Sequence, residues 1–342
     1  LFVIIAILEV VLIKQLDKTH VTALLKLIRG IWPFAMIVML LQTPRQARNI
    51  LLVLGGTVLL AFVLWLPGSV YAALSGNTAL LRSTNPVLTG NLLIDFAFES
   101  GLRTYLFIVP FSTLSAVAVA FVIYTPQYRF WGLLALGLIT IYTLSSDIAS
   151  SVISLFSSIL LTLIFSLRRP RNEISRAYTM RFIMIVLVIL GFCIMVLFIT
   201  AISPVASQML ERVLNPSADN SGSARISLLN SAFAIIENNP IGGAFSDTFW
   251  YGGHDSLITY IANWGLVFEI PYITALLMIL WNCLSIAKQT TRILERALLV
   301  GMAAAILANI VVSAVTPNII EMFADLLIWT FAGLTAVSYT HL

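Results

Sequence analysis

The chain has 342 residues, of which 60% are hydrophobic and 10% are charged, and its net charge is +4. A soluble domain carries about 25% charged residues, so this composition, with a mean hydropathy of +1.00, excludes an ordinary soluble protein. The basic residues gather in loops and form no continuous stripe, which argues against nucleic acid as a partner. The composition indicates a chain surrounded by membrane lipids.

Long apolar runs recur along the chain without the alternation of polar and apolar residues that barrel strands show. A transmembrane helix needs about 20 mainly apolar residues, and about ten runs approach that length. They fall near 1–13, 23–42, 49–66, 104–124, 129–145, 148–167, 182–202, 266–286, 297–315 and 320–338. We therefore predict an all-α polytopic membrane protein whose residues 1–342 form a single transmembrane domain. Leu1 lies inside an apolar run, so we expect the first helix to be truncated.

Basic residues in short loops orient the predicted helices, because such loops stay on the cytoplasmic side. The loops at 168–181 and 287–296 are rich in arginine and lysine, and both are predicted to be cytoplasmic. The segments 67–103 and 203–255 then lie outside. Counting the predicted spans back from these loops places a group of basic residues near the N-terminus outside, although basic residues are expected inside. The predicted orientation therefore depends on the C-terminal half of the chain. That group comprises Lys14, Lys18, Lys26 and Arg29.

The segment 203–255 is the larger exterior loop, and we expect it to contain amphipathic helices. Apolar residues recur at helical spacing over 224–237, after a turn-forming run that offers helix caps. Asn239 and Pro240 end that helix. From 255 to 286 the sequence predicts one continuous helix that enters the membrane, with a bend at Pro271.

Arg225 is expected in the first turn of the helix over 224–237. A cation opposes the helix dipole at that end. An anion shared by the guanidinium and the free backbone N–H groups removes the conflict, and phosphate or diphosphate suits both donors. The alternative is a surface arginine in contact with lipid headgroups.

His254 follows two glycines and precedes a predicted helix, so a ligand can approach it closely. Its ordinary pKa suits a general base near neutral pH. The alternative is a histidine that caps the helix or lies at the membrane interface. No second histidine, cysteine or carboxylate cluster stands at ligand spacing, so we expect neither a metal nor a cofactor.

These motifs together resemble the O-antigen ligase and polymerase family. An arginine that opens a helix is followed by N-P-I-G-G at 239–243 and by H-D-S-L-I-T-Y-I-A-N-W-G at 254–265. Upstream, Arg82 ahead of Asn85-Pro86 resembles the R…N-P-N segment of the family, and Leu144-Ser145-Ser146 resembles its S-R motif. Three departures are Asp255 in place of asparagine, Asn263 near a position that is often acidic, and Asp147 in place of the arginine after the serine.

The resemblance implies a metal-independent, inverting glycosyltransferase of the bacterial inner membrane, with 203–255 as its large periplasmic loop. The donor is a glycan on undecaprenyl diphosphate. The acceptor is another lipid-linked glycan, in a polymerase of O-antigen, capsule or exopolysaccharide, or the lipid A core, in a ligase. His254 and Arg225 are then the catalytic candidates, and Arg82, Arg103 and Arg212 are candidates for binding the diphosphate or glycan.

Two functions of other classes remain as alternatives. A polysaccharide or lipid transporter places polar or charged residues along several helices near the middle of the membrane. A non-catalytic membrane scaffold needs neither Arg225 nor His254.

Overall fold

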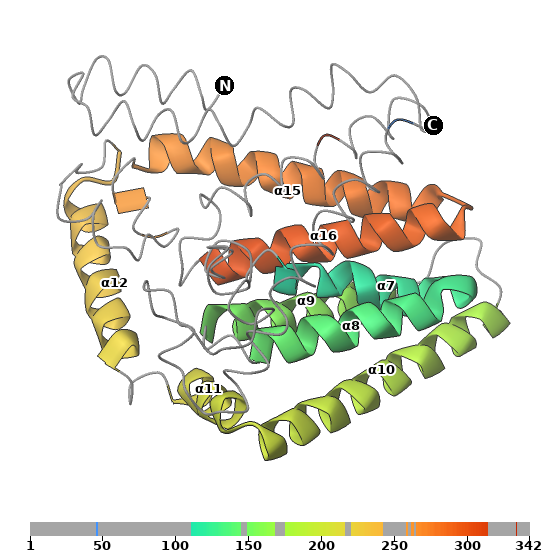
Figure 1. Cartoon of the computed structure of the whole chain (residues 1–342). Coiled ribbons are helices and arrows are strands. Elements are labelled where there is room, and N and C mark those ends of the chain that lie inside the picture. Colours follow the sequence, from blue (N-terminus) through green and yellow to red (C-terminus); the bar gives the residue numbers. More distant parts are fainter. Residues whose placement is uncertain are drawn as a thin grey trace. The chain divides into compact units, whose positions relative to one another are not determined.

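A computed structural model describes Gln46 and residues 111–144, 149–167, 175–215, 220–241, 258, 261–262, 265–313 and 333. Within that part of the chain, the structure consists of helices, and no strand occurs (Figure 1). The elements are α7 (Ser115–Tyr124), the 3-10 helix η1 (Pro126–Tyr128), α8 (Arg129–Leu144), α9 (Ala149–Leu167), α10 (Ser175–Ile202), α11 (Pro204–Leu214), α12 (Asn220–Asn238), α15 (Leu266–Gln289) and α16 (Ile293–Ser313).

Four helices in the described part are long and apolar enough to cross a membrane. These segments are Ala149–Leu167, Ala177–Ile202, Ile270–Gln289 and Ile293–Ser313. They confirm the apolar runs predicted near 148–167, 182–202, 266–286 and 297–315, and with them an all-helical membrane protein. The shorter apolar helices over Phe111–Tyr124 and α8 occupy two further runs. The remaining runs lie outside the described residues, so the total of about ten spans stays a prediction.

The chain divides into two compact units that are interleaved along the sequence. The first, here called the α7–α11 unit, comprises Leu41–Leu214 and Cys283–Ala308. The second, the α12 unit, comprises Leu1–Leu40, Asn215–Asn282 and Asn309–Leu342. The last turns of α15 and most of α16 therefore belong to the α7–α11 unit.

Helix α7 lies at the centre of the α7–α11 unit and packs against α8, α9 and α10. Its residues Val119 and Val122 are fully buried, together with Leu155 of α9, in one apolar core. Helix α10 buries one face only. On its other face, Leu197 is 68% exposed and Leu190 is 56% exposed, as expected of a helix that faces lipid.

Two glycines let helices of this unit approach at backbone distance. A Cβ atom on Gly301 of α16 would lie 2.7 Å from the Cα of Val117 in α7. A Cβ atom on Gly132 of α8 would lie 2.8 Å from the Val122 side chain and 3.0 Å from the Ala118 carbonyl oxygen. Small residues at crossings are typical of membrane helices, because lipid supplies no hydrophobic drive and close packing must stabilise the contact.

Hydroxyl side chains line the buried face of α9. The hydroxyl of Thr162 lies 2.7 Å from the Ser158 carbonyl oxygen of its own helix and 3.3 Å from the Ala116 carbonyl oxygen of α7. Such side chains are small enough to keep the helices close. Backbone carbonyls satisfy the Thr162 donor, whereas the buried hydroxyls of Ser158 and Ser166 have no hydrogen-bond partner among the described residues. We therefore interpret these hydroxyls as packing groups.

Arginine side chains close two turns at the same end of this unit. The Nε of Arg129, at the start of α8, donates to the Val122 carbonyl oxygen of α7 at 3.1 Å. Arg296 of α16 donates from Nε to the Ala287 carbonyl oxygen and from Nη2 to the Thr290 carbonyl oxygen, at 3.2 and 2.6 Å. The last carbonyls of a helix have no partner within it, so a cation returned by the next helix satisfies them and suits the helix dipole.

Helix α11 was not predicted as a separate element within 203–255. The Ser203 hydroxyl accepts a hydrogen bond from the Ala206 N–H at 3.3 Å, and Pro204 is the first helical residue. Val205, Ala206 and Met209 are buried against α9, α10 and α8. The signal was a Ser-Pro start followed by buried positions four residues apart.

We expect Gly301→Ala to destabilise the protein, because the added methyl meets the backbone of Val117. Overpacking of this kind costs about 1–3 kcal/mol, which outweighs the gain in helix propensity of about 1 kcal/mol. The measurement is the melting temperature in detergent, followed by size-exclusion fluorescence. The matched control is Gly191→Ala in α10, where nothing lies within 4 Å of the new Cβ, and its melting temperature should be unchanged or raised. Equal melting temperatures for the two variants would contradict the close crossing.

Candidate functional site

The structure describes two of the five candidate residues. Arg212 lies in the last turn of α11, where a cation complements the helix dipole. Arg225 lies in α12. His254, Arg82 and Arg103 lie outside the described residues. The meeting of Arg225 and His254 at one site therefore stays a prediction.

The helix predicted over 224–237 is present as α12, and it ends at Asn238 as expected. The Nδ2 of Asn238 donates to the Ala234 carbonyl oxygen at 2.8 Å and the Asn239 N–H donates to the Ile235 carbonyl oxygen at 2.8 Å. Pro240 follows. It has no N–H to donate to the preceding turn, which favours the end of the helix at this position.

The start of α12 differs from the expectation. The helix begins at Asn220, so Ser221 and Ser223, two of the predicted caps, are themselves helical, and the third, Asp219, lies outside the described residues. Arg225 therefore lies in the second turn, and its placement in the first turn was wrong. The free N–H groups of a helix are those of its first four residues. They precede Arg225 in the sequence, so an anion at this end would be bound first by the backbone of Asn220 to Ser223.

Helix α12 exposes an apolar stripe. Phe233 is 50% exposed and Ile226 is 45% exposed, one above the other on the helix surface, whereas Ala232 is buried. A helix with such a stripe suits the boundary between lipid and water, where the apolar side chains enter the headgroup region. This agrees with the amphipathic helix predicted over 224–237, and the exterior position of that helix stays a prediction.

The continuous helix predicted from 255 to 286 is interrupted at Gly265. This buried glycine has a φ of 78°, and its N–H donates to the Ile261 carbonyl oxygen at 2.8 Å. A left-handed residue ends a helix, and α15 begins afresh at Leu266 and continues to Gln289, with Pro271 inside it. The sequence pattern missed the break because apolar spacing continues through it.

A backbone hydrogen bond joins the two ends of the loop that carries His254. The N–H of Leu266 donates to the carbonyl oxygen of Pro240 at 2.9 Å. The first N–H of α15 is thereby satisfied, and the end of α12 is held beside the start of α15. The bond also brings the N-P-I-G-G segment to the end of the N-W-G segment, so two motifs far apart in the sequence meet.

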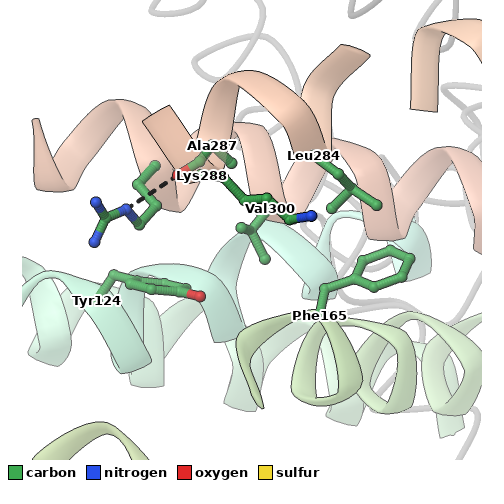
Figure 2. A pocket seen from close by; sticks show the side chains of 7 residues that line it. Tyr124, Phe165, Leu284, Ala287, Lys288 and Val300 are labelled. Carbon is green, nitrogen blue, oxygen red and sulfur yellow. Dashed lines mark hydrogen bonds between the residues drawn. The ribbon is translucent and has the colours of Figure 1, made fainter. Parts of the chain in front are cut away.

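A second candidate site, which the sequence did not predict, lies at the opposite end of α15. A cavity of about 20 Å³ is lined by Tyr124, Phe165, Leu284, Ala287, Lys288, Arg296 and Val300. Figure 2 shows Tyr124 and Phe165 on one side, facing Leu284, Ala287, Lys288 and Val300 on the other. The volume admits about one water-sized group, so no sugar or diphosphate fits inside it.

Cations surround the tyrosine of this cavity. The Arg181 guanidinium is 4% exposed and lies 5.5 Å from the ring centroid of Tyr124 and 5.2 Å from that of Tyr178, which are cation–π distances. In the adjoining turn, Arg292 and Glu295 form an ion pair at 2.8 Å. The hydrogen bond to Glu295 raises the pKa of Arg292 above its ordinary value. This pair is exposed, so it contributes little to stability.

Among the residues that the structure describes, no three His, Cys, Asp or Glu side chains come together in a way that would hold a metal ion. The two cysteines are free, Cys193 exposed and Cys283 buried.

We expect Gly265→Ala to destabilise the start of α15, because a residue with a Cβ atom is strained at this φ by roughly 1–2 kcal/mol. Gly265→Asn is the matched variant, since asparagine tolerates the left-handed region. Hydrogen exchange of the Leu266 amide measures the result. Exchange should be faster in Gly265→Ala than in the wild type and nearly unchanged in Gly265→Asn. Identical exchange in both variants would show that the left-handed turn is dispensable.

Comparison of the chain with protein-family models, with curated proteins and with solved structures finds no match. The resemblance to O-antigen ligases and polymerases therefore rests on the short motifs of the sequence.

Proposed function

We propose that this chain is a membrane glycosyltransferase of the O-antigen polymerase and ligase kind, with the polymerase as the first choice. The observation that supports it is the hydrogen bond from Leu266 to Pro240. It joins Pro240, in one motif of the resemblance, to the residue that follows Gly265, the last residue of another. The proposed location is the bacterial inner membrane, with the reaction on the periplasmic face.

The length of the chain between Pro240 and Leu266 is compatible with the proposed encounter of His254 and Arg225. Thirteen helical steps separate Arg225 from Asn238, which is about 20 Å along the axis of α12. His254 lies between the two joined ends of the loop, and an extended chain would carry it at most about 40 Å from them. The connection therefore permits an encounter of imidazole and guanidinium without opening the Pro240–Leu266 link.

The reaction needs one displacement at the anomeric carbon of the donor sugar. His254 takes the proton from the attacking hydroxyl of the acceptor sugar, whose oxygen forms the new C–O bond. The bond from the anomeric carbon to the diphosphate breaks at the same time, with inversion. Undecaprenyl diphosphate leaves with the bonding electrons. Arg225, together with Arg82, Arg103 or Arg212, stabilises the charge that develops on it.

The arrangement of cations supports the proposed orientation. Arg129, Arg181, Lys288 and Arg296 all lie at one end of the α7–α11 unit, where α7 and α15 end and where α8, α10 and α16 begin. Helix α15 runs from Leu266 to Gln289 and contains a candidate membrane span. If its basic last turn faces the cytoplasm, as such residues do, a helix that crosses the membrane begins on the periplasmic side.

We expect His254→Ala to abolish glycan transfer, with a loss of about 10²–10⁴-fold in rate from the missing base. The assay supplies purified lipid-linked repeat unit to the protein in vesicles and reads product ladders on a gel. His341→Ala serves as the matched control and should form normal ladders. Unchanged ladders in His254→Ala would remove the base assignment.

The same assay separates the rival functions through the acceptor supplied. Ladders with lipid-linked repeat unit alone identify a polymerase, and a single transfer that requires lipid A core identifies a ligase. Movement of the lipid-linked glycan across the vesicle membrane without a new glycosidic bond identifies a transporter. A scaffold leaves both glycan and lipid unchanged, and it tolerates Arg225→Ala and His254→Ala in cells.

The orientation predicts opposite labelling of two exposed positions in a background without Cys193 and Cys283. Ile241 is 70% exposed beside the Pro240 link, and the Arg292 side chain is 74% exposed in the turn before α16. In spheroplasts, a membrane-impermeant maleimide should label Ile241→Cys at once and Arg292→Cys only after lysis. The reverse labelling pattern would show that the protein has the opposite orientation in the membrane, and it would exclude a periplasmic reaction.

A further inference from the structure

Positive charge is concentrated at the basic end of the α7–α11 unit, defined by Arg129, Arg181, Lys288 and Arg296. Among the described residues there, the carboxylate present is that of Glu295, and it already accepts hydrogen bonds from Arg292 and Thr290. The cations therefore exceed the negative charge around them. Charge at the edge of a low-dielectric bundle is poorly screened, so this end attracts an anion.

Lys288 and Arg296 differ in how many of their hydrogen-bond donors are already used within the protein. Arg296 uses Nε and Nη2 to cap α15, which leaves Nη1 for another acceptor. Lys288 is exposed and makes no hydrogen bond or ion pair with the described residues. Both line the cavity beside Tyr124. The cavity has room for about one water-sized group, which matches a single phosphate oxygen at its mouth.

Exposed aromatic residues at this end suit the depth of lipid headgroups. Phe130 and Trp131, at the start of α8, are 68% and 64% exposed, and their rings meet edge to face at 5.5 Å. Exposed tryptophan beside arginine is typical of the boundary between lipid and water. An anion bound by Lys288 and Arg296 is therefore most readily supplied by the membrane itself.

We propose that Lys288 and Arg296, beside Tyr124, bind the phosphodiester headgroup of an anionic phospholipid in the leaflet at the basic end. One headgroup oxygen enters the mouth of the cavity, and the acyl chains extend along the apolar surface of the bundle. Basic pockets between membrane helices bind anionic headgroups in this way. This site is independent of the proposed glycosyl transfer, and no catalytic step depends on it.

The experiment titrates the full chain in detergent with phosphatidylglycerol, with phosphatidylcholine and with inorganic phosphate, and native mass spectrometry counts the bound molecules. We expect phosphatidylglycerol to be retained in preference to phosphatidylcholine. Lys288→Gln should weaken phosphatidylglycerol retention by about fivefold, the effect of one cation near an anionic surface. Lys288→Arg should restore it. Lys288 makes no contact that the fold requires, so Lys288→Gln is expected to fold normally.

Arg292→Gln is the matched control, because it removes the same charge from the same turn without touching the cavity. If Arg292→Gln retains phosphatidylglycerol as the wild type does, the result supports a defined lipid site. An equal loss in Arg292→Gln and Lys288→Gln would reduce the effect to general surface charge and overturn the proposal. So would equal retention of phosphatidylcholine, normal retention by Lys288→Gln, or displacement of the lipid by millimolar inorganic phosphate.

Discussion

The last carbonyl groups of a helix have no partner within it, and two turns among the described residues satisfy this constraint with side chains. Between α7 and α8 the backbone is satisfied by Thr125, whose hydroxyl donates to the Phe121 carbonyl oxygen at 2.6 Å, and by Arg129. Between α15 and α16 it is satisfied by Arg296. The residues that close the turns are thus also the charges that would orient the protein in the membrane.

The interior of the α7–α11 unit shows how polar side chains in a membrane bundle can serve packing. Thr162 and Thr140 donate to carbonyls of their own helices, and glycines at 132 and 301 bring backbones into contact. A transporter needs polar groups that line a path. The hydroxyls of Thr162 and Thr140 are small, buried and hydrogen-bonded within the bundle, so they do not by themselves indicate transport.

The proposed reaction and the proposed lipid site involve opposite ends of α15. This helix has 24 residues and is about 36 Å long, enough to separate its two ends by the hydrocarbon core. Its first residue is fixed to Pro240 in the loop that carries the catalytic candidates. Its last turn carries Lys288, next to a cavity too small for a sugar. A diphosphate on the outer side and a phosphodiester on the inner side would therefore meet different parts of the same helix.

Hydropathy alone determined that this chain is a helical membrane protein, because a helix that crosses lipid must be mainly apolar. It located α9, α15 and α16 to within about four residues, and it missed the first seven residues of α10, which include Arg176 and Arg181. Asn238 and Pro240 likewise marked the end of α12. The tertiary structure alone decided the break at Gly265, its link to Pro240 and the capping roles of Arg129 and Arg296. The sequence does not distinguish a glycine with a left-handed φ from other glycines in an apolar run. A guanidinium can donate to a carbonyl of another helix only after the two helices have packed. Sequence spacing records neither event, since both depend on contacts between segments that the chain brings together only on folding.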